Sequence, residues 1–130
     1  MEATELMVDD WVYNTHNRKP EQVCEIREHM VMLAYNDLYG YDEIEPIPLT
    51  PEILEKNGFV KSVNIRDAPP YDNNIYYSII QDGNTIFWGW WQPDNVLLIP
   101  TYSTGFITLN NTHELQHALK LCRIEKEIIL

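Results

Sequence analysis

The sequence predicts an α+β fold: a strand-rich, curved SH3-like N-terminal antiparallel sheet, a short helix, an antiparallel meander and a C-terminal helix packed on the sheet. Three observations support this prediction. The chain of 130 residues has the length of one domain. Short apolar runs alternate with polar turns in residues 1–49 and 59–110. Helix start signals open residues 50–58 and 111–124. We therefore expect a single domain over residues 1–130.

The N-terminal part is expected to form four short strands. Polar residues 14–20 separate the first two apolar runs, and this pattern predicts a hairpin. The next turns are equally tight, and short strands joined by tight turns are typical of a small, strongly curved sheet. The strands are expected at Leu6–Tyr13, Val23–Ile26, Met30–Tyr35 and Ile44–Leu49.

Residues 50–58 carry the clearest helix pattern. Thr50 suits the N-cap, Pro51 suits the first helical position, and Gly58 suits the end. A strand is expected directly afterwards, at Phe59–Ile65. The polar run Arg66–Asn74, which contains two prolines, is then expected to form a long loop and a mobile rim.

The strongest hairpin signal is Asp82-Gly83-Asn84, which stands between two aromatic-rich runs at Ile75–Ile80 and Thr85–Gln92. Either two-residue turn within it, Asp82-Gly83 or Gly83-Asn84, assigns the side chains to the same faces. One face is expected to hold Ile75, Tyr77, Ile79, Ile86, Trp88 and Trp90, and the other to hold Tyr76, Ile80, Phe87 and Trp91 around Gly89.

This hairpin is apolar on both faces, so one face belongs in the core and the second is either covered or exposed as a contact patch. We expect the C-terminal helix to cover it, because a helix packed on a sheet is the common way to bury a second face. Strands at Val96–Ile99 and Phe106–Leu109 complete the meander. If the second face is exposed, Trp and Tyr side chains are suited to anchor an interface. The candidate interaction residues are Tyr76, Trp88, Trp90 and Trp91.

The C-terminal helix is expected to begin after Asn111, whose side chain with that of Glu114 forms a variant of the capping box. Apolar residues then recur at helical spacing, which predicts a buried stripe along the helix. The stripe consists of Leu115, Ala118, Leu119 and Cys122.

The same helix contains His113-Glu114-x-x-His117, which matches the zinc-peptidase signature of two histidine ligands and a general base. A catalytic zinc also needs a third protein ligand. The extended form of the signature places Gly and His where this chain has Lys120 and Arg123. We therefore interpret the motif as coincidental and expect no enzyme activity and no cofactor.

A third zinc ligand from upstream is the open alternative. The residue types are available, but the sequence singles out none of them, and histidines in turns usually have exposed polar roles. The candidates are His16 and His29, both in turns, and Asp9 and Asp10.

Twenty acidic and nine basic residues give a net charge of −11. This charge repels phosphate backbones and anionic membranes, so it disfavours nucleic-acid and membrane partners. The chain shows no signal pattern and no apolar run of membrane-spanning length, and we expect a cytoplasmic protein. Cys24 and Cys122 are too few and too far apart for a disulfide framework or a cysteine zinc site, and we expect both thiols to be reduced and buried.

Three parts of the chain carry a resemblance. They are Glu5-Leu6 with Asp10-Trp11-Val12, then Pro46-Ile47-Pro48-Leu49-Thr50 leading to Leu54 and Asn57-Gly58-Phe59, and finally His113 with Leu115-Gln116 and Leu119. On these residues the chain resembles a family of small uncharacterised proteins encoded by gut Bacteroidetes and by their phages and integrated mobile elements. The resemblance implies no assigned activity, cofactor or partner. It also implies that Glu114 and His117 lie outside the shared pattern, and that His113 and Gln116 serve packing or hydrogen bonding.

Three functional hypotheses follow. The first is a noncatalytic accessory protein of a phage or mobile element, which acts through contacts with an unknown protein partner or with itself. The second is a minimal zinc hydrolase that uses His113, Glu114 and His117. The third is an acidic nucleic-acid mimic that inhibits a host nuclease, and it requires a continuous acidic face.

Overall fold

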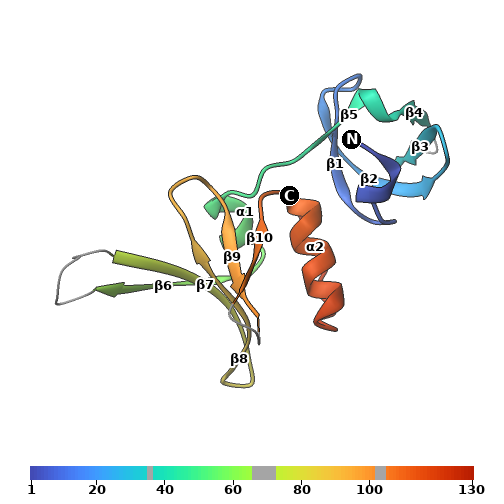
Figure 1. The fold of residues 1–130 in the computed structure, drawn as a ribbon. Helices are drawn as coiled ribbons and strands as arrows, with labels where there is room; N and C mark the ends of the chain where they lie inside the picture. The colour runs from blue at the N-terminus through green and yellow to red at the C-terminus, as the bar shows by residue number, and fades with distance from the viewer. Residues whose placement is uncertain (35–36, 66–72, 102–104) are drawn as a thin grey trace. The chain divides into compact units, whose positions relative to one another are not determined.

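The computed structural model describes residues 1–34, 37–65, 73–101 and 105–130. In these residues the chain forms ten strands in two antiparallel five-stranded sheets, together with two α-helices (Figure 1). The predicted α+β fold is confirmed. No helix in the described part of the chain is long and apolar enough to span a membrane.

Residue contacts divide the chain into two compact units. The N-terminal unit comprises residues 1–48 and 111–127, and the central unit comprises residues 49–110 and 128–130. The single domain expected from chain length stays a prediction.

The sheet of the N-terminal unit has the order β4-β3-β2-β1-β5, so the last strand returns to pair with the first. This order fits the predicted curved SH3-like sheet, which is not a closed barrel. A short 3-10 helix, η3 (Tyr41–Glu43), leads into β5. The strands are β1 (Trp11–Asn14), β2 (Lys19–Ile26), β3 (Met30–Leu33), β4 (Leu38–Gly40) and β5 (Ile44–Pro46).

Two details of this sheet differ from the prediction. Strand β4 was not expected, because it is only three residues long and so short a run leaves no alternation to detect. The first strand begins at Trp11 and not at Leu6. The chain instead forms η1 (Ala3–Glu5) and then a turn at residues 7–10, in which Asp9 has a φ of 75°. Positive φ at the third position is the mark of a type II turn.

The C-terminal helix α2 (Thr112–Leu121) belongs to the N-terminal unit and contacts β1. Leu115 and Leu119 are fully buried, as the predicted stripe requires. The prediction that this helix packs on a sheet is confirmed. The sheet is that of the N-terminal unit, whereas we expected the aromatic meander. Periodicity locates the apolar stripe of a helix, whereas it does not say which sheet the stripe covers.

The two cysteines are exposed, so the prediction of buried thiols is wrong. Cys24 lies where the register of β2 shifts against β3, and a bulge of this kind redirects side chains out of the regular alternation. Cys122 was assigned to the buried stripe, but it is the C-cap of α2 and lies one residue beyond the end of the helix at Leu121.

The central unit begins with α1 (Pro51–Lys56), in which Thr50 Oγ1 accepts a hydrogen bond from the backbone N–H of Ile53 at 3.2 Å. Gly58 ends the turn after the helix with a φ of 83°, a conformation that glycine adopts without strain. A meander of order β10-β9-β8-β7-β6 follows. Its strands are β6 (Val60–Ile65), β7 (Asn73–Gln81), β8 (Asn84–Trp91), β9 (Leu97–Pro100) and β10 (Phe106–Leu109).

The expected loop Arg66–Asn74 is shorter than predicted, because Asn73 and Asn74 already belong to β7. The rest of that loop, residues 66–72, lies outside the described residues, and so does its predicted role as a rim.

The β7–β8 hairpin turns at Asp82-Gly83, and both residues have positive φ, at 54° and 78°. These values fit the type I′ turn that favours such sequences. Beyond the turn Ile80 pairs with Thr85, but Ile79 pairs with Phe87. Ile86 is therefore the extra residue of a β-bulge, and the pairing shifts by one residue.

This shift makes the predicted faces wrong. Past the bulge, Tyr77 pairs with Gly89 and Tyr76 pairs with Trp90, so odd-numbered residues share one face and even-numbered residues share the other. A one-residue slip moves every following side chain to the opposite face of the sheet. Trp88 and Trp90 consequently lie with Tyr76 and not with Tyr77 and Ile79.

The odd-numbered face is the core of the central unit. Phe59 packs edge-on against Phe87, with ring centroids 6.1 Å apart. Burial raises the pKa of Tyr77, and the nearby carboxylates of Glu55 and then Glu52 raise it further, which places α1 beside this face. The buried side chains are Leu49, Leu54, Phe59, Tyr77, Ile79, Phe87, Leu97, Leu109 and Ile128.

Candidate functional site

The even-numbered face of the central sheet gathers large apolar side chains from β6, β7, β8 and β10. The pairings Ser62–Tyr76, Tyr76–Trp90 and Trp90–Leu98 define its side of the sheet. Leu98 in turn pairs with Thr108, which places Phe106 on the same side. We call this surface the aromatic face, and it consists of Val60, Tyr76, Ile80, Trp88, Trp90 and Phe106.

Four rings form a continuous cluster on the aromatic face. Tyr76 lies 5.8 Å from Trp88 and 5.9 Å from Trp90 between ring centroids. Trp88 and Trp90 are 5.6 Å apart, and Trp90 and Phe106 are 5.0 Å apart. The planes of these pairs meet at angles between 46° and 80°, so the rings support one another through tilted and edge-to-face contacts. They do not form a flat stack.

The cluster remains open to solvent. Phe106 is 50% exposed and Trp88 is 37% exposed, and Val60 and Ile80 add further exposed apolar surface beside them. The indole N–H of Trp90 is buried and has no hydrogen-bond partner within the described residues. Large apolar side chains that stay exposed together on one sheet face are typical of a contact surface.

The aromatic face is also uncharged. Its remaining positions whose side chains are described carry Ser62, Ser78, Thr85, Leu98, Pro100 and Thr108, and none of the described positions is ionisable except the phenol of Tyr76. Acidic residues instead stand in the turns at the two ends of β8, where Asp82 and Asp94 are exposed.

Three of the four predicted interaction residues are brought together here: Tyr76, Trp88 and Trp90. Trp91 points to the other side and meets Tyr77 edge-on at 6.0 Å. Phe106 was missed as a member of the site. Its strand was expected, but its place beside Trp90 depends on the registers of β8, β9 and β10, which no local pattern specifies.

The histidine motif on α2 is the second candidate site, and its side chains make contacts that stabilise the fold. Glu114 Oε1 accepts hydrogen bonds from the backbone N–H and the side-chain amide of Asn111, each at 3.1 Å. The expected cap is therefore present, and it occupies the carboxylate that a zinc hydrolase would use as its base.

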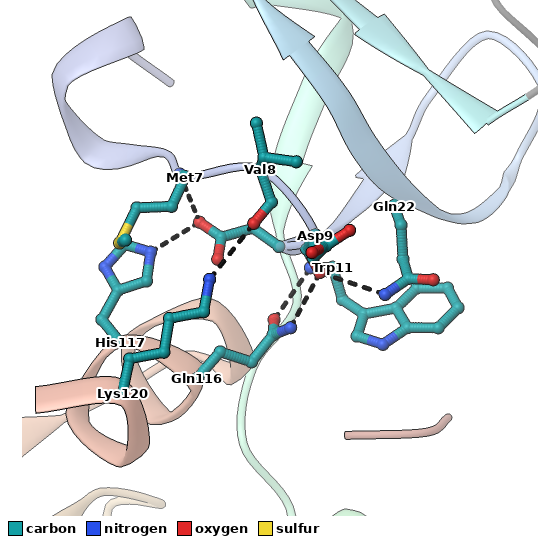
Figure 2. Close-up of polar contacts among 9 residues, drawn as sticks. Met7, Val8, Asp9, Trp11, Gln22, Gln116, His117 and Lys120 are labelled. Carbon is teal, nitrogen blue, oxygen red and sulfur yellow. Dashed lines mark hydrogen bonds and ion pairs between the residues drawn. The ribbon is translucent and has the colours of Figure 1, made fainter. Parts of the chain in front are cut away.

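His117 is engaged as well. Its Nε2 lies 2.6 Å from Oδ2 of Asp10, which also accepts a hydrogen bond from the backbone N–H of Met7 at 2.8 Å (Figure 2). Asp10 is completely buried, and its Oδ1 has no partner within the described residues. Nε2 of His117 is therefore bound to the Asp10 carboxylate, which also closes the turn at residues 7–10.

His113 packs beside His117, with ring centroids 5.6 Å apart and planes near perpendicular. It is 4% exposed, and its Nδ1 has no partner among the described residues. Burial lowers the pKa of His113, while the carboxylates of Asp10 and Glu114 oppose this effect. Burial therefore favours the neutral form of this imidazole inside the unit.

Of the upstream candidates for a third ligand, only Asp10 reaches the motif among the described residues. His16 and His29 lie exposed in their turns, where His29 has Glu28 at 3.8 Å. Within the described part of the chain, no group of three or more His, Cys, Asp or Glu side chains is arranged to hold a metal ion.

The remaining side chains of α2 bind the backbone of the turn. Gln116 accepts a hydrogen bond from the N–H of Trp11 at 2.8 Å and donates one to the carbonyl of Asp9 at 2.9 Å (Figure 2). Lys120 donates to the carbonyl of Val8 at 3.2 Å. Sequence reasoning missed these contacts, because each joins positions more than one hundred residues apart.

Comparisons with protein-family models, with curated proteins and with solved structures found no match. The geometry of the two candidate sites is therefore the basis of the functional proposal.

Proposed function

We propose that the protein is a noncatalytic accessory protein that works in the cytoplasm by binding another protein, and that the aromatic face is its contact surface. The observation that carries the proposal is the exposed, mutually supported ring cluster of Tyr76, Trp88, Trp90 and Phe106. An association with a phage or mobile element rests on the sequence resemblance alone.

The energetics of interfaces support this use of the face. Trp and Tyr are enriched among the residues that dominate binding energy, because they bury a large area at a small cost in side-chain entropy. The rings are already fixed by one another, so little ordering remains to be done when a partner binds. An uncharged patch also avoids the desolvation of charges at the centre of an interface.

The experiment exploits two neighbours on β10. Phe106 and Ile107 are each 50% exposed, but they point to opposite faces of the sheet. The wild-type chain, Trp88→Ala, Phe106→Ala and Ile107→Ala are each expressed with an affinity tag in the natural host and cross-linked to their partners. We expect Trp88→Ala and Phe106→Ala to weaken capture by roughly 2 kcal/mol or more, about thirtyfold. Ile107→Ala should retain the partner.

Thermal unfolding of all four proteins controls for loss of the fold. If folded Trp88→Ala and Phe106→Ala capture the same proteins as the wild type, the aromatic face is not the contact surface and the proposal is wrong.

A further inference from the structure

We infer that the partner of the aromatic face is a protein whose own contact patch is apolar at its centre and surrounded by lysine and arginine. This inference rests on the proposed function and adds the chemical class of the partner.

The described charged side chains of the central unit lie outside the aromatic face. The aromatic face carries no charged side chain at its described positions, while Asp82 and Asp94 are exposed in the turns at either end of β8. The described lysines are elsewhere: Lys56 is on α1, and Lys61 pairs with Tyr77 and so lies on the opposite side of the sheet. In the described part of the central unit, exposed carboxylates therefore stand in the turns at both ends of β8, beside a neutral centre.

The chain as a whole is strongly acidic. At a net charge of −11, the protein attracts cationic surfaces and repels anionic ones over about a Debye length, roughly 8 Å at physiological salt. Complementary charge at the rim raises the association rate and excludes wrong partners, whereas apolar contact at the centre supplies the affinity. A patch that satisfies both has cations around an apolar centre.

The same observations disfavour the other occupants. A second copy of this chain would bring two charges of −11 together, which opposes self-association. Nucleic acid is repelled for the same reason. A glycan would need rings presented flat to its sugar faces, whereas Tyr76, Trp88 and Trp90 meet one another at angles of 53°, 55° and 80°.

Three short synthetic peptides of equal length provide the test, each alternating apolar residues with lysine, glutamine or glutamate. Their binding to the full chain is measured by fluorescence anisotropy. We expect the lysine peptide to bind at least about tenfold more tightly than the glutamine peptide, and the glutamate peptide not to bind. Phe106→Ala and Trp88→Ala should weaken the lysine peptide by about tenfold, and Ile107→Ala by less than about twofold. Raising the salt concentration should weaken the binding of the lysine peptide to the wild-type chain.

Several results would overturn the inference. Equal binding of the glutamine or glutamate peptide would show that cations are not recognised, and the absence of any peptide binding would have the same meaning. Unchanged affinity in Phe106→Ala and Trp88→Ala would show charge attraction elsewhere on the chain. A wild-type dimer in sedimentation that Phe106→Ala dissociates would assign the face to a second copy. Face-dependent binding of a neutral oligosaccharide would assign it to a glycan.

The two proposals fail separately. If cross-linking in the host captures a partner through the aromatic face but the peptides show no preference for lysine, the contact function stands and only the partner class is wrong. If the lysine preference depends on the face but host capture does not, the proposed function is wrong in the cell.

Discussion

Gln116 hydrogen-bonds the backbone at the start of β1, as a neighbouring strand would. A primary amide carries a donor and an acceptor, and here the pair satisfies the N–H of Trp11 and the carbonyl of Asp9. The carbonyl of Asp9 also accepts a hydrogen bond from Gln22 at 3.1 Å, so the turn is fixed from both the sheet and the helix. One side chain thus joins α2 to the N-terminal sheet.

Replacing Gln116 by leucine should therefore destabilise the protein. The substitution keeps a similar volume but leaves the N–H of Trp11 without this acceptor, and we expect a loss of about 1–3 kcal/mol in the free energy of unfolding. Leu121→Gln is the matched control on the same helix, since Leu121 is 83% exposed and its change should stay within about 0.5 kcal/mol. Urea denaturation measures both. Equal stabilities for the two variants would mean that the hydrogen bonds of Gln116 contribute nothing to the stability of the fold.

His113 gives stability a dependence on pH. Burial lowers the pKa of this imidazole in the folded protein below its ordinary value of 6.5, so the unfolded chain takes up the proton more readily. The stabilising effect is complete above pH 6.5 and is lost as the pH falls toward the lowered value. The slope cannot exceed about 1.4 kcal/mol per pH unit for one group.

We expect His113→Leu to flatten the decline in stability between neutral pH and about pH 5. His29→Gln serves as the control, because His29 is exposed and its loss should leave the slope unchanged. The measurement is a series of urea unfolding curves across that range. A slope as steep in His113→Leu as in the wild type would show that another group is responsible.

At the scale of the element, one extra residue in β8 decides which side chains of the β7–β8 hairpin share a face. The bulge at Ile86 moves Trp88 and Trp90 to the face that holds Tyr76, and Phe87 to the core. Gly89 then lies tightly against β9. A Cβ at this position would stand 2.9 Å from the carbonyl oxygen of Leu98 and 2.7 Å from Cδ1 of Ile99.

Gly89→Ala should consequently strain the β8–β9 contact. A backbone oxygen cannot move aside as a flexible side chain can, and we expect a loss of about 1–3 kcal/mol in the free energy of unfolding. Gly105→Ala is the control, since its nearest contact would be Thr101 Oγ1 at 3.6 Å, an ordinary van der Waals distance. Thermal unfolding compares the two. A neutral Gly89→Ala would show that β9 has room to shift.

At the scale of the whole molecule, the acidic surface and the neutral aromatic face have complementary consequences. A charge of −11 on each chain opposes association between copies, while the uncharged face offers a surface for the apolar contact of the proposed partner. In the proposed complex, discrimination among partners would depend on the charge around the face, and affinity on the rings within it.

Much of the fold follows from local sequence. The cap at Thr50, the stop at Gly58, the turn at Asp82-Gly83 and the cap at Asn111 all occur where side-chain chemistry places them. Each depends on residues within four positions of one another, so the information is contained in a short stretch of chain. The alternation of apolar runs likewise located most of the strands.

Of the candidate site, the sequence by itself determined the residue types and not their arrangement. It supplied the aromatic side chains and the neutral segments that carry them, and it showed that one hairpin was apolar on both sides. Tertiary structure decided which rings share a face, because a single bulged residue inverts the alternation and its position depends on pairing across strands. It also decided the partner of α2. The hydrogen bonds of Gln116, His117 and Lys120 join residues more than one hundred positions apart, and such contacts are selected by the packing of the whole chain.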